Sequence, residues 1–202
     1  MSLSDLRKWD DRYREGAYAE RRHPSALVAR FAGQLAPGRA LDVACGAGRN
    51  TLYLAAAGFE VDAVDISEAG LERLRDAAGE VGRRIRTCAA DLEHGVADSL
   101  SLRTDYDLIV VVRYVNLPLL ASLADRLAPA GVLISEQHLK TDEDVIGPNS
   151  PAYRLAPSEL LDTVRGLRVH YYREGIVTDP DGRRAALAQL VASHAEATLF
   201  ID

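Results

Sequence analysis

The feature that most constrains the fold is a regular alternation of short apolar runs with longer stretches of helical spacing, which begins at Arg39. Such alternation is typical of β–α–β units, whose strands pair in parallel and whose right-handed crossovers place helices on both faces of one sheet. Residues 108–112, Leu-Ile-Val-Val-Val, are apolar at consecutive positions, as a strand covered on both faces must be. The predicted parallel strands cover residues 40–44, 59–65, 85–90, 106–112 and 131–136, and the predicted helices between them cover 49–57, 67–78 and 116–128.

The C-terminal part of the sequence predicts a different arrangement. After a short helix over 158–164, two strand-like segments over 167–174 and 184–192 flank the turn Asp179-Pro180-Asp181-Gly182, a pattern typical of a β-hairpin. We therefore predict a doubly wound, mostly parallel, seven-stranded α/β sheet of Rossmann-like type with an antiparallel C-terminal hairpin. Residues 1–202 are expected to form one domain, because the chain is long enough for one core but not for two generous ones. Within that domain, residues 1–36 are expected to form an N-terminal helical cap.

The composition of the chain limits the kinds of molecule that it is expected to bind. The chain carries 24 Lys and Arg against 30 Asp and Glu, a formal net charge of −6, which argues against a surface built to neutralise nucleic-acid phosphates. No segment approaches the ~20 apolar residues needed to span a bilayer, and the first residues lack the pattern of a signal peptide. Cys45 and Cys88 are too few for a disulfide framework. We therefore expect a soluble cytoplasmic protein, monomeric or homodimeric, that binds a small molecule and neither nucleic acid nor membrane.

The histidines show no metal-ligand spacing to cysteine or acid, so no metal site is expected. They are His23, His94, His138, His170 and His194. His138 follows the fifth predicted strand, and His23 lies in a loop beside Arg21 and Arg22. Both histidines are therefore candidates for contact with a substrate.

Residues at the carboxyl ends of the predicted strands form the expected ligand site, because an open parallel sheet binds ligands at that edge. After the first strand, Gly46-Ala47-Gly48 lets the backbone turn tightly, and amides at the start of the next helix can hold a carboxylate. Asp65 ends the second strand 19 residues after Gly46, where a carboxylate can accept from both hydroxyls of a ribose. Asp91 follows the third strand and is placed to accept from an adenine amino group.

Two positions in and near the glycine loop refine this reading. The fingerprint of NAD-binding loops has a third glycine three positions after the second, and Thr51 occupies that place. Asp42 lies inside the first strand, where a carboxylate needs hydrogen-bond donors or a positively charged ligand nearby. The sequence leaves both possibilities for Asp42 open.

The segments at 41–50, Leu-Asp-Val-Ala-Cys-Gly-Ala-Gly-Arg-Asn, and 61–67, Val-Asp-Ala-Val-Asp-Ile-Ser, resemble those of the class I S-adenosylmethionine-dependent methyltransferases. Within that class, the chain is most similar to the tellurite-resistance type. Residues 9–13, Trp-Asp-Asp-Arg-Tyr, and 118–120, Pro-Leu-Leu, support this narrower resemblance, as do residues 149–155, Asn-Ser-Pro-Ala-Tyr-Arg-Leu, and 157–160, Pro-Ser-Glu-Leu. The matching stretches extend across nearly the whole chain.

The resemblance implies S-adenosylmethionine as cofactor and a role for each matched position. The glycine loop would pass under the methionine part, Asp65 would hold the ribose, and Asp91 with Leu92 would meet the adenine. Such enzymes commonly close an N-terminal helix over the cofactor, which would bring Trp9 and Tyr13 near it. The residues expected at the cofactor are Trp9, Tyr13, Asp42, Ala44, Cys45, Gly46, Gly48, Asn50, Asp65, Ile66, Asp91, Leu92 and Arg113.

Methyl transfer is an in-line displacement, so such an enzyme must chiefly align the acceptor with the methyl carbon and exclude water. Residues 113–116, Arg-Tyr-Val-Asn, follow the fourth strand and offer no obvious general base. Enzymes that methylate base amines usually place Asn or Asp, two prolines and an aromatic residue there. We therefore expect a small acceptor, a chalcogen oxyanion such as tellurite or selenite or a small thiol, with Arg113, His138 and Arg154 as catalytic candidates offering positive charge.

Two alternatives remain from other classes. The chain would be a sensor or scaffold if it bound S-adenosylmethionine without turnover. It would be an NAD-dependent oxidoreductase if it used the same sheet and ribose carboxylate for a nicotinamide cofactor, although that class should bring the third loop glycine.

Overall fold

The computed structural model describes residues 3–93 and 102–194, and the seven strands in these ranges form one sheet in the order β3-β2-β1-β4-β5-β7-β6. The strands are β1 (Arg39–Val43), β2 (Glu60–Asp65), β3 (Ile85–Ala89), β4 (Tyr106–Val112), β5 (Leu127–His138), β6 (Arg168–Thr178) and β7 (Arg184–Ser193). Neighbouring strands from β3 to β5 pair in parallel, and β7 pairs antiparallel with both β5 and β6. The predicted mostly parallel seven-stranded sheet with an antiparallel C-terminal hairpin is confirmed.

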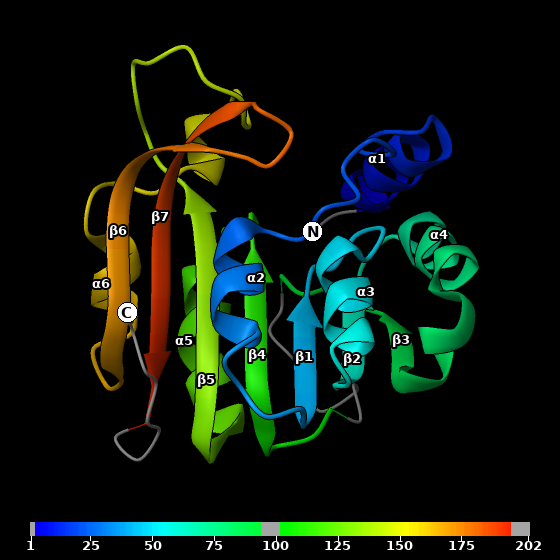
Figure 1. The fold of residues 1–202 in the computed structure, drawn as a ribbon. Coiled ribbons are helices and arrows are strands. Elements are labelled where there is room, and N and C mark those ends of the chain that lie inside the picture. Colours follow the sequence, from blue (N-terminus) through cyan, green and yellow to red (C-terminus); the bar gives the residue numbers. More distant parts are fainter. Residues whose placement is uncertain (1–2, 94–101, 195–202) are drawn as a thin grey trace.

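Helices cover both faces of this sheet (Figure 1). The helices are α1 (Leu3–Arg14), α2 (Ala26–Ala32), α3 (Arg49–Ala56), α4 (Glu68–Ala78), α5 (Leu117–Leu123) and α6 (Glu159–Thr163). In Figure 1, α2 and α3 lie in front of the sheet and α5 and α6 lie behind it. Each face therefore has its own apolar core.

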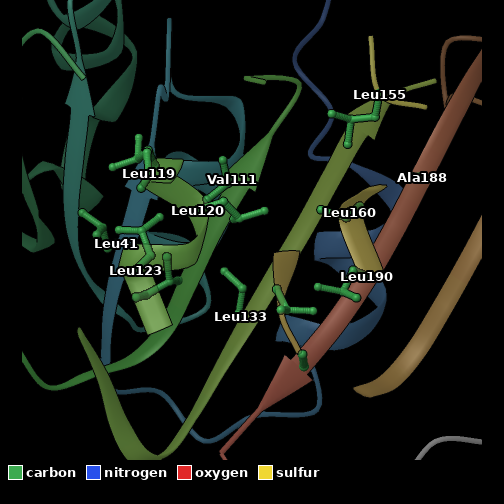
Figure 2. Close-up of a cluster of buried hydrophobic side chains, with 14 of the residues drawn as sticks. Leu41, Val111, Leu119, Leu120, Leu123, Leu133, Leu155, Leu160, Ala188 and Leu190 are labelled. Carbon is green, nitrogen blue, oxygen red and sulfur yellow. The ribbon is translucent and has the colours of Figure 1, made fainter. Parts of the chain in front are cut away.

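The two cores use alternate residues of the same strands. In β4, Leu108 and Val110 pack with α2 and α3, whereas Ile109 and Val111 pack with α5 and α6. Figure 2 shows the core between the sheet and the helices α5 and α6, in which leucines of α5 and Leu160 of α6 lie against the sheet. This double burial explains why the sequence of β4 is apolar at successive positions.

The boundaries predicted for α5 and β5 differ from those in the structure. The helix predicted over 116–128 ends at Leu123, and a short 3-10 turn, Ala124–Arg126, connects it to β5, which begins at Leu127 rather than at residue 131. Pro129 explains why the helix does not reach residue 128, because a proline disfavours helical backbone at the residue before it. At its other end β5 extends two residues further than predicted, so His138 is the last residue of the strand.

The carboxyl ends of β1, β2, β4 and β5 lie at one edge of the sheet, and α1 and the β6–β7 turn lie at the same edge (Figure 1). Helix α1 and the β6–β7 turn both lie outside the part of the chain that forms the parallel strands. Across the described ranges, we find no helix of the length and apolar character that a membrane span requires, and no group of three or more potential metal ligands. His94 lies outside the described residues.

Candidate functional site

The glycine loop leaves β1 through a run of left-handed backbone. Ala44, Gly46 and Gly48 have φ values of 55°, 57° and 79°. Glycine adopts this conformation without the steric cost that other residues meet, so the alternating glycines permit the tight entry into α3. Gly48 precedes α3 and contributes no side-chain cap to its first turn. The loop can therefore present backbone amides to an anionic group such as a carboxylate.

Asp65 at the end of β2 connects this loop to α4. Its carboxylate accepts from the backbone amide of Gly46 at 2.7 Å and from that of Ser67 at 2.9 Å. Burial raises the pKa of Asp65, although these amide contacts oppose the shift. Each carboxylate oxygen has more than one acceptor position, so Asp65 can hold the loop and still accept from hydroxyls.

Asp42 is buried beneath the first turn of α3, and the structure shows what stabilises it there. The hydroxyl of Thr51 donates to its carboxylate at 2.6 Å. Burial nevertheless raises the pKa of Asp42 to about 7. The position where NAD-binding loops have a third glycine is therefore used here for a side-chain hydrogen bond between helix and strand.

The N-terminal helix α1 packs against the glycine loop. The ring of Tyr13 is buried, and its hydroxyl lies where a β-carbon on Gly46 would be. The Trp9 ring lies 6.3 Å from the Tyr13 ring, centroid to centroid. Asp10 accepts from the hydroxyl of Ser67 at 2.6 Å and from the amide of Ala69 at 3.2 Å, at the start of α4. Helix α1 therefore packs against the glycine loop and the start of α4, with the Tyr13 ring beside Gly46.

The remaining cofactor candidates are held by contacts of their own. Burial raises the pKa of the Cys45 thiol, which argues against a nucleophile. Asn50 accepts from the amide of Ser25 at 2.9 Å. Asp91 accepts from the amide of Glu93 at 2.9 Å, whereas Leu92 is buried in the core behind the sheet. Ile66 follows Asp65 and is half-buried.

Beyond the loop, a cluster of charged side chains lies at the ends of β4 and β5. Arg113 has a left-handed backbone, φ 61°, and its guanidinium donates to Glu136 at 3.2 Å and to Asp179 at 2.5 Å. Glu136 also accepts from Ser25 at 3.0 Å and from Gln189 at 2.9 Å. Two carboxylates therefore partly neutralise Arg113.

His138 lies in this cluster as a neutral imidazole. Burial, together with the positive charges of Arg113, Arg154 and Arg21, lowers its pKa to about 3. The expectation that His138 offers positive charge is therefore wrong, because protonation would bury a further cation among arginines. Its Nδ1 atom is buried without a hydrogen-bond partner.

Arg154 anchors the long loop over residues 140–156. Its guanidinium donates to the carbonyls of Pro148 and Leu139 at 2.8 and 2.9 Å. Two residues of this loop form isolated β-bridges: Leu155 pairs with Leu139, directly after β5, and Ile146 pairs with Ala185 of β7. These contacts show that Arg154 anchors its own loop, and its use as a catalytic residue stays a prediction.

The sequence indicated the N-terminal loop only through His23, and it did not indicate that the hairpin turn contributes to the cluster. Arg21 lies within 3.8 Å of Asp179 and 3.5 Å of Asp181, which belong to the turn between β6 and β7. The turn was recognised from its sequence, but its closeness to β4 follows only from the insertion of β7 beside β5. The sequence predicted Glu136 only as the last residue of a strand. Like Asp42, it is an acidic residue in a predicted strand, and this could have marked it as a candidate site residue.

Comparison with known proteins shows which family this chain belongs to. The family model described as "Tellurite resistance protein TehB" matches residues 8–127. A curated relative, the "Probable S-adenosyl-L-methionine-dependent methyltransferase TehB" of Haemophilus influenzae, is 26% identical over 161 residues, which are 74% of this chain and 54% of the relative. The chain thus spans about half the length of that relative.

Two solved structures share the architecture. The crystal structure of TehB from Haemophilus influenzae is 23% identical, with a TM-score of 0.67 over 88% of this chain and 66% of that one. The glycopeptide N-methyltransferase MtfA, crystallised with S-adenosyl-L-methionine, is 18% identical, with a TM-score of 0.61 over 85% of this chain and 87% of that one. At these identities the likeness establishes a common fold, that of the class I methyltransferases.

Proposed function

Because this chain belongs to the TehB family of tellurite resistance proteins, we propose that it binds S-adenosylmethionine and transfers the methyl group to a small anionic acceptor. The acceptor we propose is a chalcogen oxyanion such as tellurite or selenite, or a small thiol in its thiolate form. The two cysteines of the chain are free thiols, in keeping with action in a reducing cytoplasm.

The observation that carries the proposal is the direct connection between the glycine loop and the arginine-containing cluster. The backbone amide of Ser25 donates to Asn50 at the start of α3, and the hydroxyl of the same residue donates to Glu136 at 3.0 Å. A ligand on the loop and a second ligand at the end of β4 would therefore be neighbours. Transfer between two bound molecules requires this adjacency.

The residues of the loop suit an adenosyl compound with a free amino acid part. The uncapped start of α3 favours a carboxylate, and Asp65 is an acceptor for ribose hydroxyls at the neighbouring strand end. When bound, S-adenosylmethionine supplies an electrophilic methyl group on a sulfonium. Transfer of that methyl group to an acceptor atom would leave the bonding electron pair on sulfur, so the protein would chiefly have to hold and orient the two molecules.

On the acceptor side, the protein orients the acceptor and excludes water. Arg113 provides the guanidinium nearest to the end of β4, and Arg49 at the start of α3 adds charge to the same region. His138 stays neutral near pH 7, so it can exchange hydrogen bonds with an acceptor without repelling other cations. An acceptor that is already anionic needs no strong base.

Ligand binding followed by turnover tests this proposal. Calorimetric titrations with S-adenosylhomocysteine, S-adenosylmethionine and NAD should give heat with the first two and none with NAD. Methyl release should then be measured over tellurite, selenite and small thiols, with product formation expected for at least one. Absence of binding by both adenosyl compounds refutes the proposal, and binding without turnover on any acceptor favours the sensor or scaffold.

A further inference from the structure

Buried polar atoms without hydrogen-bond partners are concentrated at one place in the described residues. Among the described residues, five side-chain atoms are buried without a partner, and four of them belong to the cluster beyond the glycine loop. These four are Arg21 Nε, Arg113 Nη1, His138 Nδ1 and Asp179 Oδ2. A buried polar atom without a partner costs free energy, so four together indicate a place built for a molecule that supplies the missing contacts.

The four atoms come from four separate segments that meet at the same edge of the sheet. Arg113 follows β4, His138 ends β5, Asp179 follows β6, and Arg21 lies in the loop between α1 and α2. Asp179 connects two of them, with Oδ1 2.5 Å from Arg113 Nη2 and Oδ2 3.8 Å from Arg21 Nη2. Arg21 Nε is 3.5 Å from Asp181, within ion-pair range but without a hydrogen bond.

The charges of the cluster partly cancel. Arg21 and Arg113 oppose Glu136, Asp179 and Asp181, and His138 is neutral. Arg49 and Arg154 add positive charge from α3 and from the long loop, since both interact electrostatically with members of the cluster, and Arg183 pairs with Asp181. The resulting positive excess suits a small anion.

We infer that Arg21 and Asp179 contact the methyl acceptor, so that the N-terminal loop and the β6–β7 turn complete the acceptor site. Arg21 Nε and Arg113 Nη1 offer two N–H donors, and Asp179 Oδ2 offers an acceptor for a proton on the bound molecule. The complementary ligand is a small acid that carries one negative charge and one remaining proton. This inference rests on the proposed function for the identity of the site.

Arg21 has a matched control in its neighbour. Arg22 follows it in the same loop but is exposed and has no place in the cluster. Arg21→Ala should raise the acceptor KM by about tenfold or more, the loss expected for a charged hydrogen bond, and leave the dissociation constant of S-adenosylhomocysteine within about twofold. Arg22→Ala should leave both constants unchanged.

Conservative variants separate acceptor contact from a purely structural connection between loop and hairpin. Arg21→Lys keeps the positive charge but lacks the Nε donor, and Asp179→Asn keeps the shape but loses the acceptor charge. Both should retain the melting temperature more closely than Arg21→Ala and still raise the acceptor KM. An unchanged acceptor KM in Arg21→Ala overturns the inference, as does a parallel loss of affinity for acceptor and S-adenosylhomocysteine.

A binding measurement keeps the inference independent of turnover. Selenite is titrated into wild-type protein and Arg21→Ala, each loaded with S-adenosylhomocysteine. Binding by the wild type that is lost in Arg21→Ala supports an anion contact at Arg21, even if no methyl product forms and the proposed function fails. Equal binding by the two proteins, or none by the wild type, refutes the inference.

Discussion

The hydroxyl of Tyr13 occupies the space in which Gly46 would carry a side chain. A β-carbon on Gly46 would overlap that hydroxyl, and one on Gly70 of α4 would lie 3.1 Å from the same ring. Two glycines from different segments therefore accommodate one tyrosine. Gly46 serves the docking of α1 as well as the turn of its own loop.

Gly46→Ala should consequently destabilise the protein and weaken S-adenosylhomocysteine binding. Two costs combine: a non-glycine residue at φ 57°, worth roughly 1–2 kcal/mol, and displacement of Tyr13. A double-mutant cycle separates them, because Gly46→Ala should cost less in a Tyr13→Ala background. Denaturant unfolding of the four proteins provides the measurement, and strictly additive costs would contradict the contact.

Asp65→Asn should separate the two uses of that carboxylate. The two carboxylate oxygens accept separately from the backbone amides of Gly46 and Ser67, and asparagine has only one oxygen for them. The free energy of unfolding of Asp65→Asn should therefore be about 1–3 kcal/mol lower than that of the wild type. If Asp65 also accepts from ribose, calorimetry should record a loss of S-adenosylhomocysteine affinity of about tenfold or more. Asp91→Asn is the comparison at the next strand end, and unchanged affinity in Asp65→Asn would remove Asp65 from the cofactor site.

Asp42 should make the stability fall as pH rises through the weakly acidic range. Its pKa rises from 3.8 to about 7 on folding, so the folded state holds the proton more tightly than the unfolded state. The associated stabilisation is present below pH 3.8 and is lost towards pH 7, with a slope of at most ~1.4 kcal/mol per pH unit. Relative to wild type, Asp42→Asn should gain stability across that window.

Asp62→Asn is the control of opposite sign for this titration. Hydrogen bonds from Arg86 and Tyr106 outweigh burial and lower the pKa of Asp62. The wild type should therefore lose its advantage over Asp62→Asn as pH falls. Unfolding curves at several pH values measure both variants, and parallel trends in the two would contradict the assignment.

His138 should reduce stability in acid. Its pKa falls from 6.5 to about 3, so the unfolded chain takes up a proton that the folded protein refuses. The loss begins as pH falls through 6.5 and continues towards pH 3, reaching roughly 2 kcal/mol by pH 5. His138→Gln lacks this titration, so its stability relative to wild type should improve between pH 7 and pH 5; a constant difference would show that the imidazole charges freely.

The sequence predicted correctly those parts of the fold that depend on residues close together in the chain. The boundaries of β4 and the entry into α3 were predicted correctly, because consecutive apolar residues and left-handed glycines act within a few positions. The connection of Asp65 to the loop also follows from strand ends meeting at one edge. The helix after β4 was predicted too long, because its pattern was extended to Ala128, where Pro129 disfavours helical backbone.

The charge state of the cluster could not be predicted in the same way. Arg113 and Asp179 are 66 positions apart, and they meet only because β7 pairs with β5. His138 loses its charge through burial and through arginines from three other segments. These effects depend on neighbours that the sequence does not place, and sequence alone therefore identified the arginine without its partners.

The position of β7 has a consequence for synthesis. Although it follows β6 in the chain, it occupies the place between β5 and β6, and nine of its ten residues are buried. A nascent chain that has not yet released this strand from the ribosome leaves the amides and carbonyls along one side of β5 bare, ready to pair with another polypeptide. Translational arrest before Arg184 would therefore yield an aggregation-prone product, and chaperone demand should end once this strand emerges.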